Sequence, residues 1–365
     1  MALLFLVALG LAMARCPCSD SRLCAPVSVP LSSRKELFVF ADFFSTVAQH
    51  YNYSQLTTLA VFNRKLGDPP APFLCKAHEH DVRVVHLVDI DAAILLNRTA
   101  RAAWVHDVVS DCTASFCDGL NIDFEAPVAR GSAESAALTA LVEETCTAIH
   151  GANEHAQCTF DVAWNSGGVD GRFYDFAAIS NATDFVFVMA YDTRSQLSLA
   201  ECFAGANSPT NAVVRGLQSY AALRVSNVIL GLPWYGYRYK CLPGHNPTDS
   251  SPCKIPPVPF AGAPCSDASG SQHSYADILA LLESGQNATA VRVQAATASL
   301  EFNWRNGSDV FEYWFDDART LATKFAIAKK FQAKGVGVWT IDMAPYASNW
   351  RATQEMWQAF NAFLL

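Results

Sequence analysis

The stretch Asp118-Gly119-Leu120-Asn121-Ile122-Asp123-Phe124-Glu125 alternates between apolar and polar side chains from Leu120 onward. Successive side chains of a β-strand point to opposite faces, so the three apolar residues share one face and Asn121, Asp123 and Glu125 share the other. Carboxyl groups inside a protein cost free energy unless they are paired or functional. The stretch therefore predicts a strand with one packed face and one functional face.

Two other interpretations also fit this stretch. A solvated edge strand shows the same alternation. Closely spaced acids also bind calcium, but the spacing of an EF-hand loop is absent here. The position in the chain favours a functional site, because the stretch is the fourth of eight strand-like runs. Glu125 falls at its carboxyl end, where the active sites of barrel enzymes lie.

The eight runs are short and rich in apolar, β-branched or aromatic residues, and helical patterns separate most of them. The runs cover residues 37–40, 59–62, 82–87, 120–124, 158–162, 185–189, 228–232 and 336–340. The clearest helical patterns cover residues 92–109, 133–149, 211–223 and 318–334. Near-continuous hydrophobicity is typical of parallel strands that are covered on both faces. The alternation predicts an α/β protein with a (β/α)8 TIM barrel. A doubly wound sheet is the alternative, but no Gly-rich phosphate loop follows the first run.

The connection after the seventh run is much longer than the others. Residues 238–316 contain many Pro and Gly residues, three cysteines and a helical pattern near residues 275–282. Two strand-like runs flank Asn306-Gly307, which is a strong hairpin signal. We predict a small α+β insertion on the active face of the barrel. A disordered linker fits poorly with so many aromatic residues and cysteines.

The beginning of the chain is typical of an exported protein. Residues 1–14 form an apolar run that ends in Ala12-Met13-Ala14, the pattern of a secretory signal peptide. The run is shorter than the roughly 20 residues that span a bilayer, and we expect no membrane span elsewhere. We expect residues 15–365 to form a single catalytic barrel.

Cysteines and sequons agree with export. The chain has twelve cysteines, an even number that suggests disulfides, with Cys112/Cys117 and Cys146/Cys158 as candidate pairs. Cysteine spacings match no zinc site, so we predict no metal and no cofactor. Five Asn-x-Ser/Thr sequons are predicted glycosylation sites, namely Asn52, Asn97, Asn181, Asn287 and Asn306.

The formal net charge of −8 argues against a nucleic-acid partner, because no basic stretch exists to release counterions. We expect a monomer by default.

The acidic stretch resembles the hallmark of glycoside hydrolase family 18, Asp-x-x-Asp-x-Asp-x-Glu on the fourth barrel strand. Asp118, Asp123 and Glu125 match, and Asn121 replaces an Asp. Three further pieces occur in the family's order, namely Met189-Ala190-Tyr191-Asp192 after strand six, residues 231–237 (Gly-Leu-Pro-Trp-Tyr-Gly-Tyr) on strand seven and Trp339 on strand eight. The family's Ser-x-Gly-Gly on strand three is missing, and residues 85–89 (Val-His-Leu-Val-Asp) stand in its place.

Within the family the chain is most similar to a lysosomal subgroup that splits the chitobiose core left from N-linked glycans. This resemblance rests on Cys16-Pro17-Cys18, Asn121, residues 160–164 (Phe-Asp-Val-Ala-Trp) and residues 262–267 (Gly-Ala-Pro-Cys-Ser-Asp). The resemblance implies lysosomal delivery, with secretion as the alternative.

The family resemblance implies hydrolysis of β-1,4-linked N-acetylglucosamine with retained configuration, in which the substrate's acetamido oxygen is the nucleophile. Glu125 would be the acid, Asp123 would orient the acetamido nitrogen and Tyr191 would bond its oxygen. Strand rise places Asp123 about 7 Å from Glu125 on the same face. Asp123 is therefore beside Glu125 and not across a sugar ring from it, as a second, opposed carboxylate would be.

Other residues are candidates for contacting or supporting the substrate. Trp339 would be the floor of the site, and an aromatic residue without such positional support belongs more often to the core. Aspartates in such a pocket bond sugar hydroxyls, hold a loop or cap a helix. The candidates for substrate binding are Asn121, Met189, Asp192, Trp339, Tyr235, Trp164, Trp314 and Asp316, with Asp118 as structural support. We expect His86 to be a core histidine.

Two other functions stay open. An endo-acting chitinase with an open groove would use the same residues, and a glycan-binding lectin would keep the fold without catalysis. The presence of Glu125 argues against the lectin.

Overall fold

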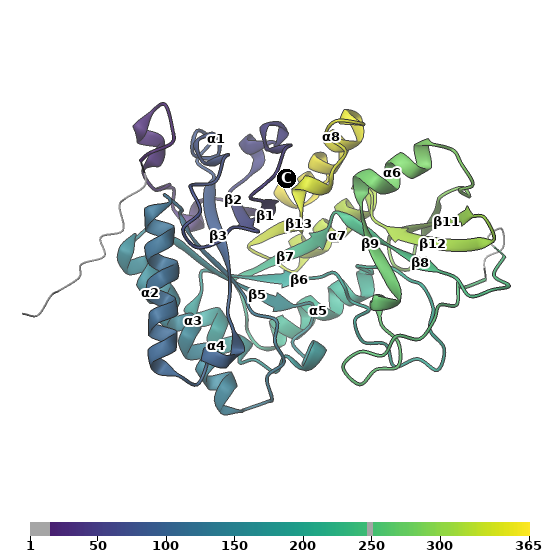
Figure 1. The fold of residues 1–365 in the computed structure, drawn as a ribbon, viewed down its shortest axis with the longest axis horizontal. Helices are drawn as coiled ribbons and strands as arrows, with labels where there is room; N and C mark the ends of the chain where they lie inside the picture. The colour runs from purple at the N-terminus through teal and green to yellow at the C-terminus, as the bar shows by residue number, and fades with distance from the viewer. Residues whose placement is uncertain (1–14, 247–250) are drawn as a thin grey trace, which may run out of the picture.

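The computed structural model describes residues 15–246 and 251–365, so the predicted signal peptide lies outside the described residues. Eight parallel strands close into a barrel in the order β1-β13-β7-β6-β5-β4-β3-β2 (Figure 1). Each of the eight predicted runs forms one of these strands, and the predicted TIM barrel is confirmed. Their bounds are β1 Glu36–Asp42, β2 Thr58–Phe62, β3 Arg83–Asp89, β4 Gly119–Asp123, β5 Gln157–Ala163, β6 Phe185–Met189, β7 Val228–Pro233 and β13 Gly335–Trp339.

Helices cover the outside of the barrel. The four predicted patterns correspond to α2 Arg98–Ala114, α3 Ala133–Ala152, α5 Thr210–Ala222 and α7 Ala318–Lys330. Helix α2 begins later than predicted because Asn97 caps it, with its side-chain oxygen accepting from the backbone N–H groups of Thr99 and Ala100. Four shorter helices were not predicted, namely α1 Leu74–His78, α4 Phe176–Ala182, α8 Trp350–Gln358 and α9 Asn361–Leu364.

Alternation along the strands divides the core into two layers. On β4, Leu120, Ile122 and the following Phe124 belong to the large cluster between the barrel and the helices. Phe38, Phe40 and Phe187 fill the barrel interior, with ring centroids 4.9–5.4 Å apart. The polar side chains of β4 therefore face the interior, where the aromatic layer forms the bottom of any site at the strand ends.

The predicted insertion after strand seven is an antiparallel sheet with one helix, drawn beside the barrel in Figure 1. The predicted hairpin is present, with Asn306 opposite Asp309 and Gly307 in the left-handed region at φ 60°. The sheet has the order β10-β11-β12-β8-β9. Its elements are β8 Tyr235–Lys240, β9 Gly270–Ser274, α6 Tyr275–Glu283, β10 Arg292–Gln294, β11 Ser299–Asn306 and β12 Asp309–Phe315.

All twelve cysteines form disulfides, and both predicted pairs are present. The Cys202–Cys265 bond links the segment after β6 to the insertion, and Cys18–Cys75 links the N-terminal segment to α1. The remaining bonds are Cys16–Cys24 and Cys241–Cys253.

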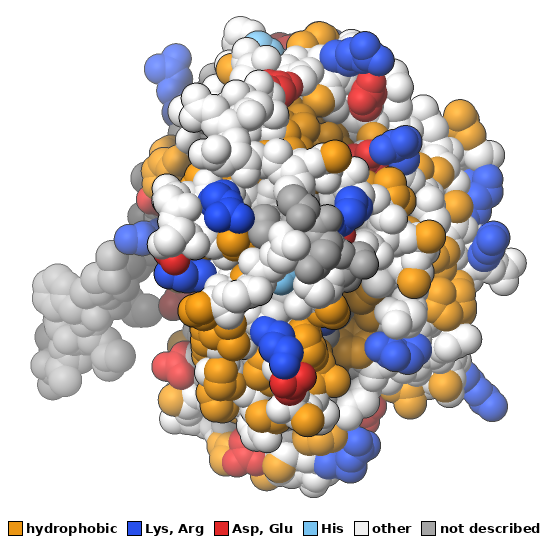
Figure 2. All heavy atoms as spheres, turned by 90° about the vertical axis from the view of Figure 1, so that its right-hand side faces the viewer, with side chains coloured by type: hydrophobic (Ala, Val, Ile, Leu, Met, Phe, Trp, Pro, Cys, Tyr) orange, Lys and Arg blue, Asp and Glu red, His pale blue; other side chains and the backbone are white. Residues whose placement is uncertain are grey.

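The surface carries the predicted sequons in accessible positions. Asn97, Asn181, Asn287 and Asn306 are exposed and Asn52 is half-buried, and their glycosylation stays a prediction. On the face that Figure 2 shows, Lys and Arg side chains are spread among polar and hydrophobic ones. Within the described ranges, no helix has the length and apolar character needed to cross a bilayer.

Candidate active site

A pocket opens at the carboxyl ends of β4, β5 and β6, the end of the barrel at which the sequence places Glu125. The barrel strands and the long loop after β5 supply most of its wall, and the insertion supplies the rest. Four carboxyl groups, one guanidinium and three aromatic rings face it. The lining residues are Glu125, Ala163, Trp164, Val169, Asp170, Arg172, Met189, Tyr191, Asp192, Ser195, Phe260, Asp267 and Ala268.

Glu125 lies at the pocket with 48% of its side chain exposed. Its Oε2 atom lies 2.5 Å from Nη2 of Arg172, and the same nitrogen lies 3.6 Å from Oδ2 of Asp170. An isolated β-bridge pairs the backbone of Arg172 with that of Val128 and holds the loop that carries the arginine. Arg172 was not predicted as a site residue, because it lies in the loop after β5 and belongs to no motif.

Asp123, the last residue of β4, lies two residues before Glu125 and is half-buried. Burial, followed by the negative charges of Glu125 and Asp89, raises the pKa of Asp123 to about 7, whereas Arg172 lowers it. This carboxyl group therefore exchanges its proton in the range in which many hydrolases work.

Asn121 is fully buried inside the barrel and does not reach the pocket wall. Its Nδ2 donates to Oδ2 of Asp161 on the neighbouring strand β5, at 2.8 Å. Burial, followed by the charge of Asp123, raises the pKa of Asp161 well above its usual range. Sequence analysis gave Asp161 no role, although alternation places it on the same interior face as Asn121.

Tyr191 and Asp192 follow β6 and both line the pocket. Burial, followed by the charges of Asp161 and Asp123, raises the pKa of Tyr191 well above its usual range, so its hydroxyl is a donor at all working pH values. Oδ1 of Asp192 accepts hydrogen bonds from the hydroxyls of Tyr235 and Tyr237, at 2.6 and 2.9 Å. Tyr235 is 3% exposed and thus lies behind the pocket, where it holds Asp192 in place.

The predicted aromatic residues separate into two groups. Trp164 lines the pocket, as does Met189. Trp339 packs in the barrel with its ring centroid 5.0 Å from Phe40 and 4.8 Å from Phe62, so its function as a floor stays a prediction. Trp314 is on β12 of the insertion, and its Nε1 donates to Glu312 at 2.7 Å.

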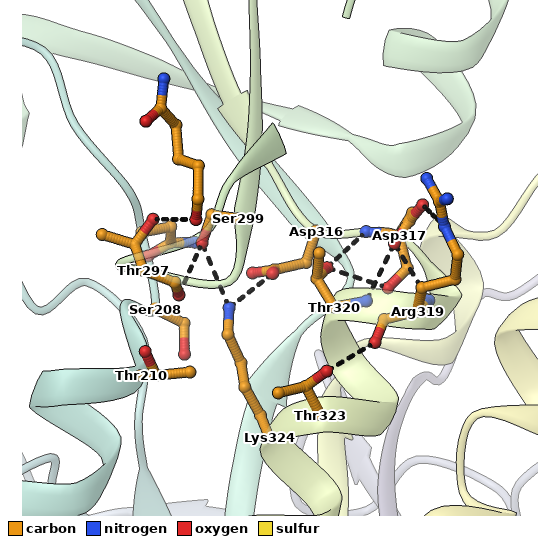
Figure 3. A network of polar contacts seen from close by, with 12 residues as sticks. Ser208, Thr210, Thr297, Ser299, Asp316, Asp317, Arg319, Thr320, Thr323 and Lys324 are labelled. Carbon is orange, nitrogen blue, oxygen red and sulfur yellow. Dashed lines mark hydrogen bonds and ion pairs between the residues drawn. The ribbon is translucent and has the colours of Figure 1, made fainter. Parts of the chain in front are cut away.

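Asp316 does not fit the predicted contact with sugar. Its side chain is 1% exposed and forms an ion pair with the fully buried ammonium of Lys324, at 2.5 Å (Figure 3). A buried ammonium group is costly without a counter-ion, and Asp316 supplies one. The adjacent Asp317 caps α7 together with Thr320 (Figure 3). This pair of aspartates therefore anchors the start of α7.

Asp118 supports the opposite end of the barrel and not the pocket. Its two carboxylate oxygens accept from the backbone N–H groups of Val27 and Val84 and contact Nε2 of His78, each at 2.8 Å. These bonds join the N-terminal segment to the amino ends of β3 and β4. His86 is buried, with Nδ1 3.6 Å from Asp111.

Comparison with known proteins identifies relatives over almost the whole chain. A family model described as glycosyl hydrolases family 18 matches residues 92–344. Di-N-acetylchitobiase of Rattus norvegicus is 37% identical over 349 residues, which cover 94% of this chain and 92% of that protein. The Homo sapiens protein of the same name is 35% identical over 356 residues, which cover 96% of this chain and 89% of that protein.

Solved structures share the fold at lower identity. A chitinase from Cycas revoluta, solved in complex with (GlcNAc)3, has a TM-score of 0.68 and 19% identity and covers 88% of this chain and 99% of its own. The C-terminal domain of a putative chitinase from Desulfitobacterium hafniense has a TM-score of 0.70 and 18% identity and covers 91% of this chain and 100% of its own.

Proposed function

Because this chain belongs to glycosyl hydrolase family 18, we propose that it hydrolyses the β-1,4 bond between the two N-acetylglucosamine residues of the chitobiose core. The observation that carries this proposal is that Glu125, Tyr191 and Met189 line one pocket, while Asp123 ends β4 two residues before Glu125. The names of the rat and human relatives favour a chitobiose substrate over long chitin.

The proposed reaction needs an acid for the leaving oxygen and a nucleophile for the anomeric carbon. Glu125 donates its proton to the glycosidic oxygen while the acetamido carbonyl oxygen of the substrate attacks the anomeric carbon. Asp123 accepts a hydrogen bond from the acetamido N–H, and the Tyr191 hydroxyl donates to the acetamido oxygen. The ionised Glu125 then takes a proton from water, which opens the cyclic intermediate with overall retention.

Trp164 supplies an apolar wall for the sugar, and Asp192 bonds its hydroxyl groups in this proposal. The tyrosine hydroxyls that bond Oδ1 of Asp192 leave its other oxygen for the substrate. Trp339 is the proposed floor.

The proposed setting is the lysosome, with secretion as the alternative, and the proposed form is a monomer. Six disulfides are typical of an oxidising, exported environment. The predicted leader and the exposed sequons agree with that route.

The test of this function compares wild type with Glu125→Gln on an oligosaccharide that ends in a free chitobiose core. We expect turnover to fall about a thousandfold because glutamine cannot donate the proton, while substrate binding measured by calorimetry is retained. Glu143→Gln on the exposed face of α3 is the matched control and keeps full turnover. Unchanged turnover in Glu125→Gln would discard the assignment.

The same assay separates the open alternatives. Reducing the terminal sugar to its alditol blocks a chitobiase that needs a free reducing end but not an endo-acting chitinase. Equal rates on free and blocked substrates would favour the chitinase. Binding without any turnover by wild type would favour the lectin.

A further inference from the structure

Three buried oxygen atoms beneath the pocket have no hydrogen-bond partner among the described residues. They are the Oδ1 atoms of Asn121, Asp123 and Asp161. The first two lie on β4 and the third on β5, its neighbour in the barrel. Buried acceptors are almost always satisfied in folded proteins, so this group requires a donor.

A hydrogen bond within this group fixes the orientation of Asp161. Nδ2 of Asn121 can only donate, and it contacts Oδ2 of Asp161 at 2.8 Å. Oδ2 is therefore the accepting oxygen of Asp161. Oδ1 is the oxygen that is left to carry a proton.

The surroundings of Asp161 oppose its ionisation. Its side chain is 2% exposed, and the ionisable groups that act on it are Asp123, Glu125 and Asp89. Tyr191, after β6, faces the same group as a neutral hydroxyl. Arg172 stabilises the charge of Asp123, but its guanidinium is bonded to Glu125.

Two interacting carboxyl groups in such surroundings do not both carry a negative charge. Burial raises the pKa of Asp161 well above its usual range and raises that of Asp123 to about 7. Of the two, Asp161 is the more deeply buried, with a relative exposure of 2%, whereas Asp123 is only half-buried. The proton of the pair therefore resides on Asp161 when Asp123 is ionised.

We propose that Asp161 is a positioning residue that stays a neutral carboxylic acid, and that its Oδ1–H group donates to Oδ1 of Asp123. This bond would turn the second oxygen of Asp123 toward the substrate. The inference rests on the proposed function for its catalytic consequence, but the protonation of Asp161 is a separate property of the fold. No proton leaves the pair in the reaction, so the step adds no charge and needs no further reactant.

Asn121 completes this arrangement because an amide cannot ionise. It supplies a donor to Asp161 without adding another negative charge to the interior. An acid at this position would compete for the same proton.

The first test compares Asp161→Asn with Asp161→Ala. An asparagine at 161 can accept from Asn121 with its oxygen and donate to Asp123 with its NH₂ group, so it mimics the neutral acid. We expect kcat of Asp161→Asn to stay within about threefold of the wild-type value. We also expect the plot of kcat/KM against pH to fall at the same acidic pH as in wild type. We expect Asp161→Ala to lower kcat about a hundredfold with little change in KM, because Asp123 loses its donor.

Val162→Ala is the matched control on the same strand. Val162 is buried in the outer layer, so the variant loses packing without touching the pair, and kcat stays at the wild-type value. A loss of kcat in Asp161→Asn equal to that in Asp161→Ala would overturn the proposal. So would a shift of the acidic limb to lower pH in Asp161→Asn, because it would show that the wild-type residue carries a negative charge.

Infrared difference spectroscopy tests the protonation without any turnover. We expect the difference between folded wild type and Asp161→Asn to contain the carbonyl band of a protonated carboxyl group at pH 5 to 7. A carboxylate band in its place would overturn the proposal even if the enzyme acts on another substrate. If Asp161→Ala does not fold, the infrared spectrum and the pH dependence of kcat/KM in Asp161→Asn still test whether Asp161 is protonated.

Discussion

Nη2 of Arg172 lies 2.5 Å from Oε2 of Glu125 and 3.6 Å from Oδ2 of Asp170, so one guanidinium contacts the proposed acid and a second carboxylate of the same pocket. Burial, followed by the charges of Glu125 and Asp89, raises the pKa of Asp123, and the positive charge of Arg172 lowers it. Arg172 therefore acts on three carboxyl groups at or beside the pocket.

Replacing Arg172 by Gln removes this positive charge from the free enzyme. We expect the acidic limb of the plot of kcat/KM against pH to move to higher pH, because Arg172 lowers the pKa of Asp123 and the variant no longer does so. Arg130→Gln is the control, since Arg130 is exposed and packs over Phe173 outside the pocket lining. An acidic limb that stays in place, or that moves to lower pH, would show that Arg172 does not act on Asp123.

Asp267 is the charged group that the insertion adds to the pocket. Burial, followed by the charges of Asp192 and Asp170, raises the pKa of Asp267 to about 7, and its Oδ2 has no partner among the described residues. We expect Asp267→Asn to raise KM about tenfold with kcat nearly unchanged, because a hydrogen bond to a sugar hydroxyl is weakened. Steady-state kinetics on the chitobiose core measures both constants.

The matched control is Asp309→Asn, since Asp309 lies in the surface hairpin of the same insertion and pairs with Lys240. If Asp267→Asn lowers kcat and leaves KM unchanged, Asp267 acts in the chemical step and not in binding.

His78 should make the protein more stable in acid. Its Nδ1 lies 2.6 Å from the carbonyl oxygen of Leu23 and its Nε2 lies 2.8 Å from Oδ2 of Asp118. Both partners are acceptors, so both ring nitrogens carry hydrogen and the ring is a cation. Burial alone would lower the pKa of His78, but the hydrogen bond and charge of Asp118 outweigh it and raise the pKa.

A histidine whose pKa is raised in the folded state contributes stability that is fully present below its unfolded value near 6.5 and is lost as pH rises through the folded value. We expect His78→Gln to lower the free energy of unfolding by about 2 kcal/mol at pH 5.5 and by less at pH 8.5, measured by urea denaturation. The exposed His106→Gln is the control. An equal loss at both pH values would contradict the charged state.

The barrel could be predicted because its strands are local patterns. The run at 185–189 is short and apolar throughout, which favours a strand covered on both faces, and β6 has the same bounds. Helices α4 and α9 were missed because seven and four residues are too short to show a helical period.

The site could be predicted only where residues adjoin a strand. Glu125 and Tyr191 lie two residues beyond the last residues of β4 and β6, so the strand positions predict where they lie. Arg172 reaches the pocket from a loop and Asp267 reaches it from the insertion. No motif or spacing in the sequence predicts that either residue lies near Glu125. Asp316 was misplaced because its partner Lys324 lies eight residues away, and nothing local shows that this lysine turns inward.

The central claim is that the substrate's own acetamido group attacks the anomeric carbon, with Glu125 as the acid and Asp123 beside it. Proton NMR of the newly formed reducing end, recorded before mutarotation, tests this most directly. The account predicts that the first product is the β-anomer, because two displacements at the same carbon retain configuration. A first product in the α form would contradict it, because a single attack by water, activated by another carboxylate of the pocket, would then be the reaction.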